Sequence, residues 1–275
     1  MRIRHPTTGV GRNWWTGLLW VVILVPLRSL GQDQPQIPSA APPRQPPEPS
    51  KFTFEERADM FMARKAYADA ADYYQRALKQ SGFSPAQLWN KLGIADQQKG
   101  NNRAARKAYN EALHRRQDFS EALNNIGTTY FLENKYSKSI KYYLRSLQTY
   151  PGSALVHLNL GTAYYHKKKY AEAVKEYQHA LTLDPNVLAG QATLGSEIRP
   201  VLGEQMHRAG GEYYFYLAKV FASLGRPEEA VRYLRRSLED GFGDLKKIRE
   251  DPDLQKMNQF PAYGELLANP PVPIK

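Results

Sequence analysis

A repeat of fixed length is the feature that most constrains what this chain can fold into. Residues 120–153 and 154–187 align without gaps as two copies of one 34-residue unit. A constant period of this length indicates stacked copies of one supersecondary unit, whereas a bundle of unrelated helices needs no period. Similar residues recur at matching places, as in Ile126-Gly127 and Leu160-Gly161, Tyr130 and Tyr164, Tyr136 and Tyr170, Tyr143 and Tyr177, and Pro151 and Pro185.

Within each unit, the apolar residues recur at the period of an α-helix. In the first copy they are Leu123, Ile126, Tyr130, Ile140, Tyr143 and Leu147. The segment 133–135 predicts a turn between two helices, and Pro151 predicts the end of the second because proline cannot continue a helix. Small residues such as Gly127 permit a close helix–helix approach. Neither helix could bury its apolar stripe alone, so neighbouring units must stack.

This pattern resembles the tetratricopeptide repeat (TPR), a helix–turn–helix unit. The resemblance implies an all-α fold, a right-handed α-solenoid of about five such units with a C-terminal helical cap. The same register predicts units at 51–85 (a degenerate first unit), 86–119, 120–153, 154–187 and 211–244, with an irregular insertion at 188–210. Residues 245–268 are expected to cover the last unit as the cap, with helices starting at Asp251-Pro252 and Pro261, and 269–275 to form a tail.

The first 31 residues have the pattern of a secretory signal peptide. Arginines at positions 2, 4 and 12 precede an uncharged run from Asn13 to Leu27, and Ser29-Leu30-Gly31 offers a cleavable boundary. The run is shorter than the roughly 20 residues that span a bilayer. A membrane tether through residues 13–27 nevertheless stays open, because Trp14 and Trp15 suit a membrane interface. We expect an exported protein, periplasmic or secreted, with inner-membrane anchoring by an uncleaved segment as the alternative.

Residues 32–50 contain seven prolines and almost no large apolar side chains. Such a segment cannot form a packed core, and it predicts a disordered, extended linker. The chain has no cysteine, which neither supports nor contradicts export.

The formal net charge of +11 does not by itself predict a nucleic-acid-binding protein. The basic clusters lie in turns or late in second helices, where cations complement the helix dipole, and not on one face between aromatic residues. We therefore expect a solvated basic surface and no nucleic-acid partner. Weak attraction to an anionic membrane or an acidic partner is the second reading.

No motif for catalysis or for cofactor binding is found in the sequence. Among the six histidines, only His157 and His166 share a predicted helix, and their separation of nine residues is not the spacing that places two imidazoles on one metal ion. We expect no enzymatic activity, no cofactor and no metal site. An enzyme with its site in the 188–210 insertion ranks last among the alternatives.

The TPR resemblance also implies that first helices line a concave groove that binds a peptide or a partner helix. Asn125 and Asn159 occupy equivalent places, where stacked amides could pair with a peptide backbone. The chaperone-binding clamp of the family is absent, since Asn90 and Ile94 stand where it needs lysine and asparagine. The predicted partner-binding residues are Asn90, Lys91, Ile94, Gln97, Asn124, Asn125, Thr128, Phe131, Leu158, Asn159, Thr162 and Tyr165.

These observations favour a non-enzymatic protein–protein interaction scaffold in the bacterial cell envelope. The alternative is a structural subunit of an envelope assembly that uses its convex face or its cap. The sequence predicts neither the identity of the partner nor the oligomeric state.

Overall fold

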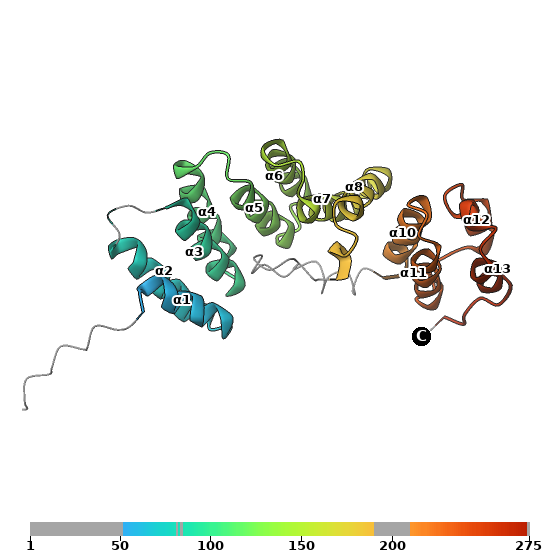
Figure 1. Ribbon diagram of the computed structural model, residues 1–275, viewed down its shortest axis with the longest axis horizontal. Helices are drawn as coiled ribbons and strands as arrows, with labels where there is room; N and C mark the ends of the chain where they lie inside the picture. The colour runs from blue at the N-terminus through green and yellow to red at the C-terminus, as the bar shows by residue number, and fades with distance from the viewer. Residues whose placement is uncertain (1–51, 81, 83–84, 190–209, 274–275) are drawn as a thin grey trace, which may run out of the picture. The chain divides into compact units, whose positions relative to one another are not determined.

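Consecutive helices form antiparallel pairs in the computed structural model, which describes residues 52–80, 82, 85–189 and 210–273 (Figure 1). Regular structure within these residues is entirely helical, without a strand, which confirms the predicted all-α class. The first four pairs are α1 (Phe54–Ala63) with α2 (Tyr67–Gln80), α3 (Ala86–Gln98) with α4 (Asn102–Arg115), α5 (Ser120–Leu132) with α6 (Tyr136–Thr149), and α7 (Ala154–His166) with α8 (Tyr170–Leu183). A short 3-10 helix, η1, follows at Val187–Ala189, and a fifth pair consists of α10 (Gly210–Ser223) and α11 (Pro227–Glu239).

Each pair is joined by a short turn with one residue in the left-handed conformation. These residues have positive φ angles and are Lys65, Gly100, Asn134, Lys168 and Gly225. In the third turn, the amide of Lys135 donates to the carbonyl of Tyr130 at 2.9 Å, which closes the helix end in the Schellman manner. Glycine and asparagine adopt this conformation readily, and the turn geometry imposes it on the two lysines as well.

A glycine in the first helix lies against a tyrosine ring of the second helix in the three central pairs. Gly93 faces Tyr109, Gly127 faces Tyr143 and Gly161 faces Tyr177, and the three rings are fully buried. A Cβ atom on Gly127 would lie 2.6 Å from Cε1 of Tyr143, closer than real Cβ contacts. The outer pairs hold Ala58 with Tyr74 and Ala218 with Leu234 at the same spacing of 16 residues, and all four are 0% exposed.

The hydroxyl of each central tyrosine finds a partner on the first helix of its own pair. Tyr109 donates to Oε1 of Gln97 at 2.9 Å and Tyr177 donates to Oγ1 of Thr162 at 3.2 Å. The hydroxyls of Tyr143 and Thr128 lie 3.1 Å apart. Burial raises the pKa of Tyr143 to about 12, so this phenol stays neutral at physiological pH. The first helices must therefore carry buried polar residues.

Neighbouring units stack mainly through the second helix of one unit and the first helix of the next, which pack together as α2 with α3, α4 with α5 and α6 with α7. First helices also touch directly, α3 with α5 and α5 with α7. The stack continues across the break in the sequence period, because α10 packs against α8. At this junction the amide of Gln178 donates to Oγ of Ser223 at 2.6 Å, and the rings of Tyr177 and Tyr213 meet edge to face.

The C-terminal cap contains α12 (Leu245–Glu250), the 3-10 helix η2 (Leu254–Met257) and α13 (Pro261–Ala268). η2 contacts α10, and α13 contacts α11, so the cap covers the fifth pair as predicted. Pro261 begins α13, as expected, whereas Asp251 ends α12 and the next helical segment, η2, begins three residues later at Leu254. Oδ1 of Asp251 accepts the amides of Asp253 at 3.0 Å and Leu254 at 3.3 Å, which leads the chain into η2, and its other oxygen pairs with Lys219 at 2.7 Å. Buried cap residues include Ile248, Leu254, Met257, Tyr263 and Leu266.

None of the described helices has the length and apolar character needed to cross a bilayer. The predicted signal peptide or anchor (1–31), the linker (32–50) and residues 190–209 of the predicted insertion lie outside the described residues.

The contact between Gly127 and Tyr143 can be tested with a matched pair of substitutions. Gly127→Ala should lower the free energy of unfolding by about 1–3 kcal/mol relative to Gly264→Ala, because an added methyl group overpacks the first site only. Gly264 lies in α13 with no atom within 4 Å of an added Cβ, and both changes gain the same helix propensity. Chemical denaturation followed by circular dichroism measures the difference. Equal stabilities would show that the ring moves aside at no cost.

Candidate functional site

The residues predicted to bind a partner lie on three first helices, α3, α5 and α7. Most of them are buried in the structure, and two, Asn90 and Lys91, are half-buried. Exposures are 5% for Asn124, 1% for Asn125 and 5% for Asn159. Exposures of 8% or less are also found for Ile94, Gln97, Thr128, Phe131, Leu158, Thr162 and Tyr165.

Four of these residues form a continuous chain of side-chain amides, here named the amide chain: Asn90, Asn125, Asn124 and Asn159. Nδ2 of Asn125 donates to Oδ1 of Asn90 at 3.1 Å, and Nδ2 of Asn124 donates to Oδ1 of Asn125 at 3.2 Å. Nδ2 of Asn159 then donates to Oδ1 of Asn124 at 2.9 Å. The amide chain thus links α3, α5 and α7. Asn125 and Asn159, the amides predicted to meet a peptide backbone, are already connected through Asn124.

Lys91 belongs to the interface between the first two units. Its Nζ lies 3.0 Å from Glu55 and 2.8 Å from Asp59, both in α1. Asp59 also accepts a hydrogen bond from the hydroxyl of Tyr74 at 2.6 Å. Burial alone would lower the pKa of Lys91, but the hydrogen bonds to the two carboxylates outweigh it and raise the pKa. The lysine charge is therefore neutralised inside the array and still partly accessible.

The two predicted aromatic residues pack between units. The ring of Phe131 lies 5.2 Å from that of His166, and the hydroxyl of Tyr165 donates to Glu212 of α10 at 3.2 Å. Burial and the negative charge of Glu212 both raise the pKa of Tyr165. Both rings thus bridge one unit to the next, and partner contact by this set stays a prediction.

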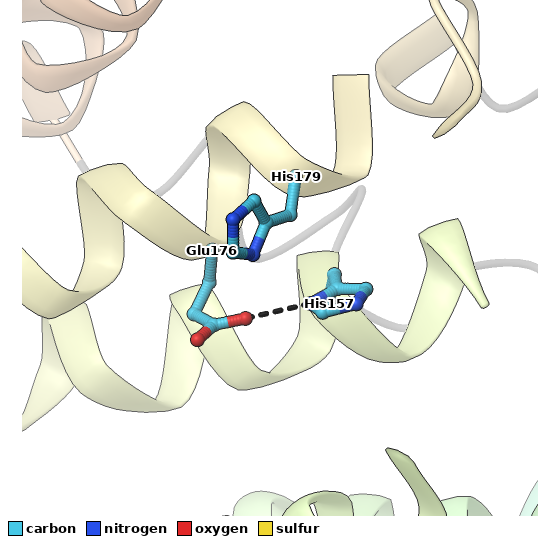
Figure 2. A group of neighbouring side chains, drawn as sticks. All are labelled: His157, Glu176 and His179. Carbon is cyan, nitrogen blue, oxygen red and sulfur yellow. Dashed lines mark hydrogen bonds and ion pairs between the residues drawn. The ribbon is translucent and has the colours of Figure 1, made fainter. Parts of the chain in front are cut away.

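A cluster of potential metal ligands, His157, Glu176 and His179, joins α7 to α8 (Figure 2). Nδ1 of His157 lies 2.7 Å from Oε2 of Glu176, and the rings of His157 and His179 meet edge to face with centroids 5.2 Å apart. The side chains of His157 and Glu176 are 13% and 19% exposed, and His179 is exposed.

The sequence predicts no metal site, because no two histidines have the spacing that places them on one metal ion in one predicted helix. The structure assembles the cluster from two helices instead. A signal was present: Glu176 and His179 are three residues apart, which places them on one helical face. Gly161 of α7 contacts Tyr177 of α8, and the two helices are antiparallel. A residue one turn before Gly161 therefore lies opposite a residue one turn after Tyr177, which places His157 near residue 180.

Comparison with known families identifies the repeat. Models of the tetratricopeptide repeat match residues 54–85, 90–154, 154–187 and 216–246. The chain belongs to the tetratricopeptide repeat family. The matched ranges overlap all five helix pairs, including the pair of α10 and α11 after the break in the period. No curated protein matches the chain.

Several solved structures resemble the chain at low sequence identity. A crystal structure of MamA is 17% identical, with a TM-score of 0.46, and the match covers 67% of this chain and 94% of that one. For MamA from Desulfovibrio magneticus RS-1, from residue 41 to its end, the identity is 15%, the TM-score 0.47, and the coverages 68% and 93%. YrrB, a TPR protein with an unusual peptide-binding site, is 18% identical, with a TM-score of 0.43 and coverages of 51% and 73%.

Asn124 is the residue on which the amide chain of these TPR units should depend most. Asn124→Ala removes the donor to Asn125 and the acceptor for Asn159 at once, and leaves two buried amides without their partner. We expect the free energy of unfolding to fall by about 2–4 kcal/mol. The control, Asn110→Ala, replaces an exposed asparagine of α4 and should change it by less than about 0.5 kcal/mol. Denaturant unfolding distinguishes the two, and a small effect at Asn124 would mean that the amide chain does not hold the units together.

Proposed function

We propose that this TPR array is a non-enzymatic scaffold that binds a protein or peptide partner on the surface of its first helices. The observation that carries the proposal is the direct contact of α3 with α5 and of α5 with α7, which makes one continuous surface from three units. Stacked repeats of this kind present extended binding surfaces because every unit repeats the same exposed positions. We call the surface of α3, α5 and α7 the first-helix face.

The amide chain prepares this face for binding by holding its helices in register. Its members lose little side-chain freedom when a partner arrives, because they are already ordered by bonds to one another. At its α3 end, Asn90 is half-buried and presents amide surface beside the charge pair of Lys91 and Asp59. Glu121, at the start of α5, is exposed. The accessible groups are thus polar and of both signs, which suits a polypeptide partner better than a polyanion.

Partner binding by the first-helix face can be tested with two variants that introduce the same side chain on opposite helices of one unit. Asn90→Arg puts a long cation on α3, and Asn110→Arg puts the same side chain on the exposed surface of α4. We expect Asn90→Arg to lower recovery of the native partner from envelope extracts about tenfold, because a loss of about 1.4 kcal/mol of binding free energy weakens the affinity by that factor. Asn110→Arg should leave the recovery unchanged. Quantitative pull-down with the full chain measures both.

A second variant separates binding from folding, because Asn90→Arg also removes the acceptor of Asn125. Glu121→Lys lies on the first-helix face but outside the amide chain, and it should reduce recovery. It removes an exposed ion pair with Arg116 and the carboxylate in the first turn of α5, so the free energy of unfolding should fall by no more than about 1 kcal/mol. If Asn110→Arg abolishes recovery and both first-helix variants retain it, the partner uses the second helices, as a structural subunit of an assembly would.

The proposed place of action is the bacterial cell envelope. Its support is the signal-peptide pattern of residues 1–31, followed by the proline-rich segment 32–50 that would act as a spacer. Arginines before the apolar run and small residues after it are the features that an export signal needs.

N-terminal sequencing of the mature protein from fractionated cells tests this location. Cleavage near Gly31 with recovery in the periplasm or the medium is the expected result. An intact N-terminus in the membrane fraction would indicate the anchored form, and an intact N-terminus in the cytosol would contradict export.

A further inference from the structure

Three potential ligands meet where α7 and α8 run side by side (Figure 2). They are Nδ1 or Nε2 of His157 and His179 and a carboxylate oxygen of Glu176, and one such atom from each lies within 4.8 Å of the others. α8 places Glu176 and His179 on one face because they are three residues apart, and α7 brings His157 against them.

A backbone contact orients the ring of His157. Its Nε2 lies 3.0 Å from the carbonyl oxygen of Pro151, which can only accept, so Nε2 carries a hydrogen and donates it. In the neutral ring, Nδ1 then holds the lone pair, and it lies 2.7 Å from Oε2 of Glu176. Two lone pairs at this distance need a cation to hold them together, either a proton or a metal ion. A second nitrogen bonded to a backbone carbonyl is the usual arrangement of a histidine that binds metal.

We propose that His157, Glu176 and His179 bind a divalent transition-metal ion, for which Zn²⁺ is the probe. Imidazole and carboxylate ligands suit Zn²⁺, whereas Mg²⁺ and Ca²⁺ prefer sets made of oxygen atoms alone. Two histidines and one glutamate leave at least one coordination position for water or for a group of a bound partner.

The present geometry needs only small side-chain movements to accept the ion. Ligands at about 2.0–2.2 Å from a tetrahedral Zn²⁺ lie about 3.4 Å from one another. Nδ1 of His157 and Oε2 of Glu176 are closer than this, at 2.7 Å, and no ligand pair exceeds 4.8 Å. Because His179 is exposed, its ring can turn toward the other two without disturbing the core.

The competing arrangement is an ion pair in which a proton on Nδ1 of His157 faces Glu176. This pair needs His157 and Glu176 but makes no use of His179. The role of His179 therefore distinguishes the two arrangements, and His114 is its matched control, since it is an exposed histidine late in another second helix, α4.

Calorimetric titration of the tag-free, full-length chain with Zn²⁺ tests the site. We expect one ion per chain, with affinity at least about tenfold weaker in His179→Ala and in Glu176→Gln, and unchanged in His114→Ala. Zn²⁺ should also raise the melting temperature of the wild type and of His114→Ala, and not that of His179→Ala. Co²⁺ should give the visible absorption of a low-coordinate site, and Mg²⁺ at equal concentration should give no shift.

The proposal would be overturned if His179→Ala bound Zn²⁺ with wild-type affinity, whether or not Glu176→Gln weakened the binding. His179 would then not be a ligand, and the contact between His157 and Glu176 would be an ion pair only. Failure of Glu176→Gln to fold would leave the test with His179→Ala, whose exposed side chain makes no hydrogen bond or ion pair within the described residues. Absence of Zn²⁺ binding by the wild type would equally overturn it, and would not bear on partner binding at the first-helix face.

Discussion

The close contact between a glycine of the first helix and a tyrosine sixteen positions later, found in the three central units, is the constraint on which the rest of the structure depends. At Gly93, Gly127 and Gly161, even one added carbon would overlap the facing tyrosine ring. The contact brings the two backbones together and fixes how far each helix is displaced along the other. Since the same spacing recurs from unit to unit, the pairs can stack in one regular way.

A consequence of using tyrosine at this position is that its hydroxyl must be satisfied inside the array. Gln97, Thr128 and Thr162 provide the partners, so the first helices carry polar residues at positions that water cannot reach. The asparagines of the amide chain extend the same pattern from within units to between them. Polar residues on these helices therefore stabilise the array whether or not a partner binds. A partner can contact only the accessible side-chain surface around Asn90, Lys91 and Glu121.

The periodic part of the fold could be predicted from the sequence because it depends on local features: the helical period of apolar residues, the turn at 133–135, the prolines and the small residues. The burial of Asn124, Asn125 and Asn159 could not, because an asparagine in a helix has the same pattern whether it faces solvent or a neighbouring amide. The cluster of His157, Glu176 and His179 was missed for a related reason, since it depends on the register between two helices. That register is set by the contact between Gly161 and Tyr177. Both residues can be read from the sequence, but their contact is known only from the folded pair.

Two members of the cluster, Glu176 and His179, lie on α8, a second helix that packs against both α7 and α10. Four consecutive residues of α8 have different neighbours: Glu176 and His179 lie near His157 of α7, Tyr177 packs on Gly161, and Gln178 bonds to Ser223 of α10. Because these residues are on one rigid helix, anything that fixes the rotation of α8 against α7 also fixes where α10 is held. An ion at the cluster would therefore restrict the same degree of freedom that the Gly161–Tyr177 contact restricts. Its effect would extend to the fifth unit and the cap, since α10 in turn contacts η2.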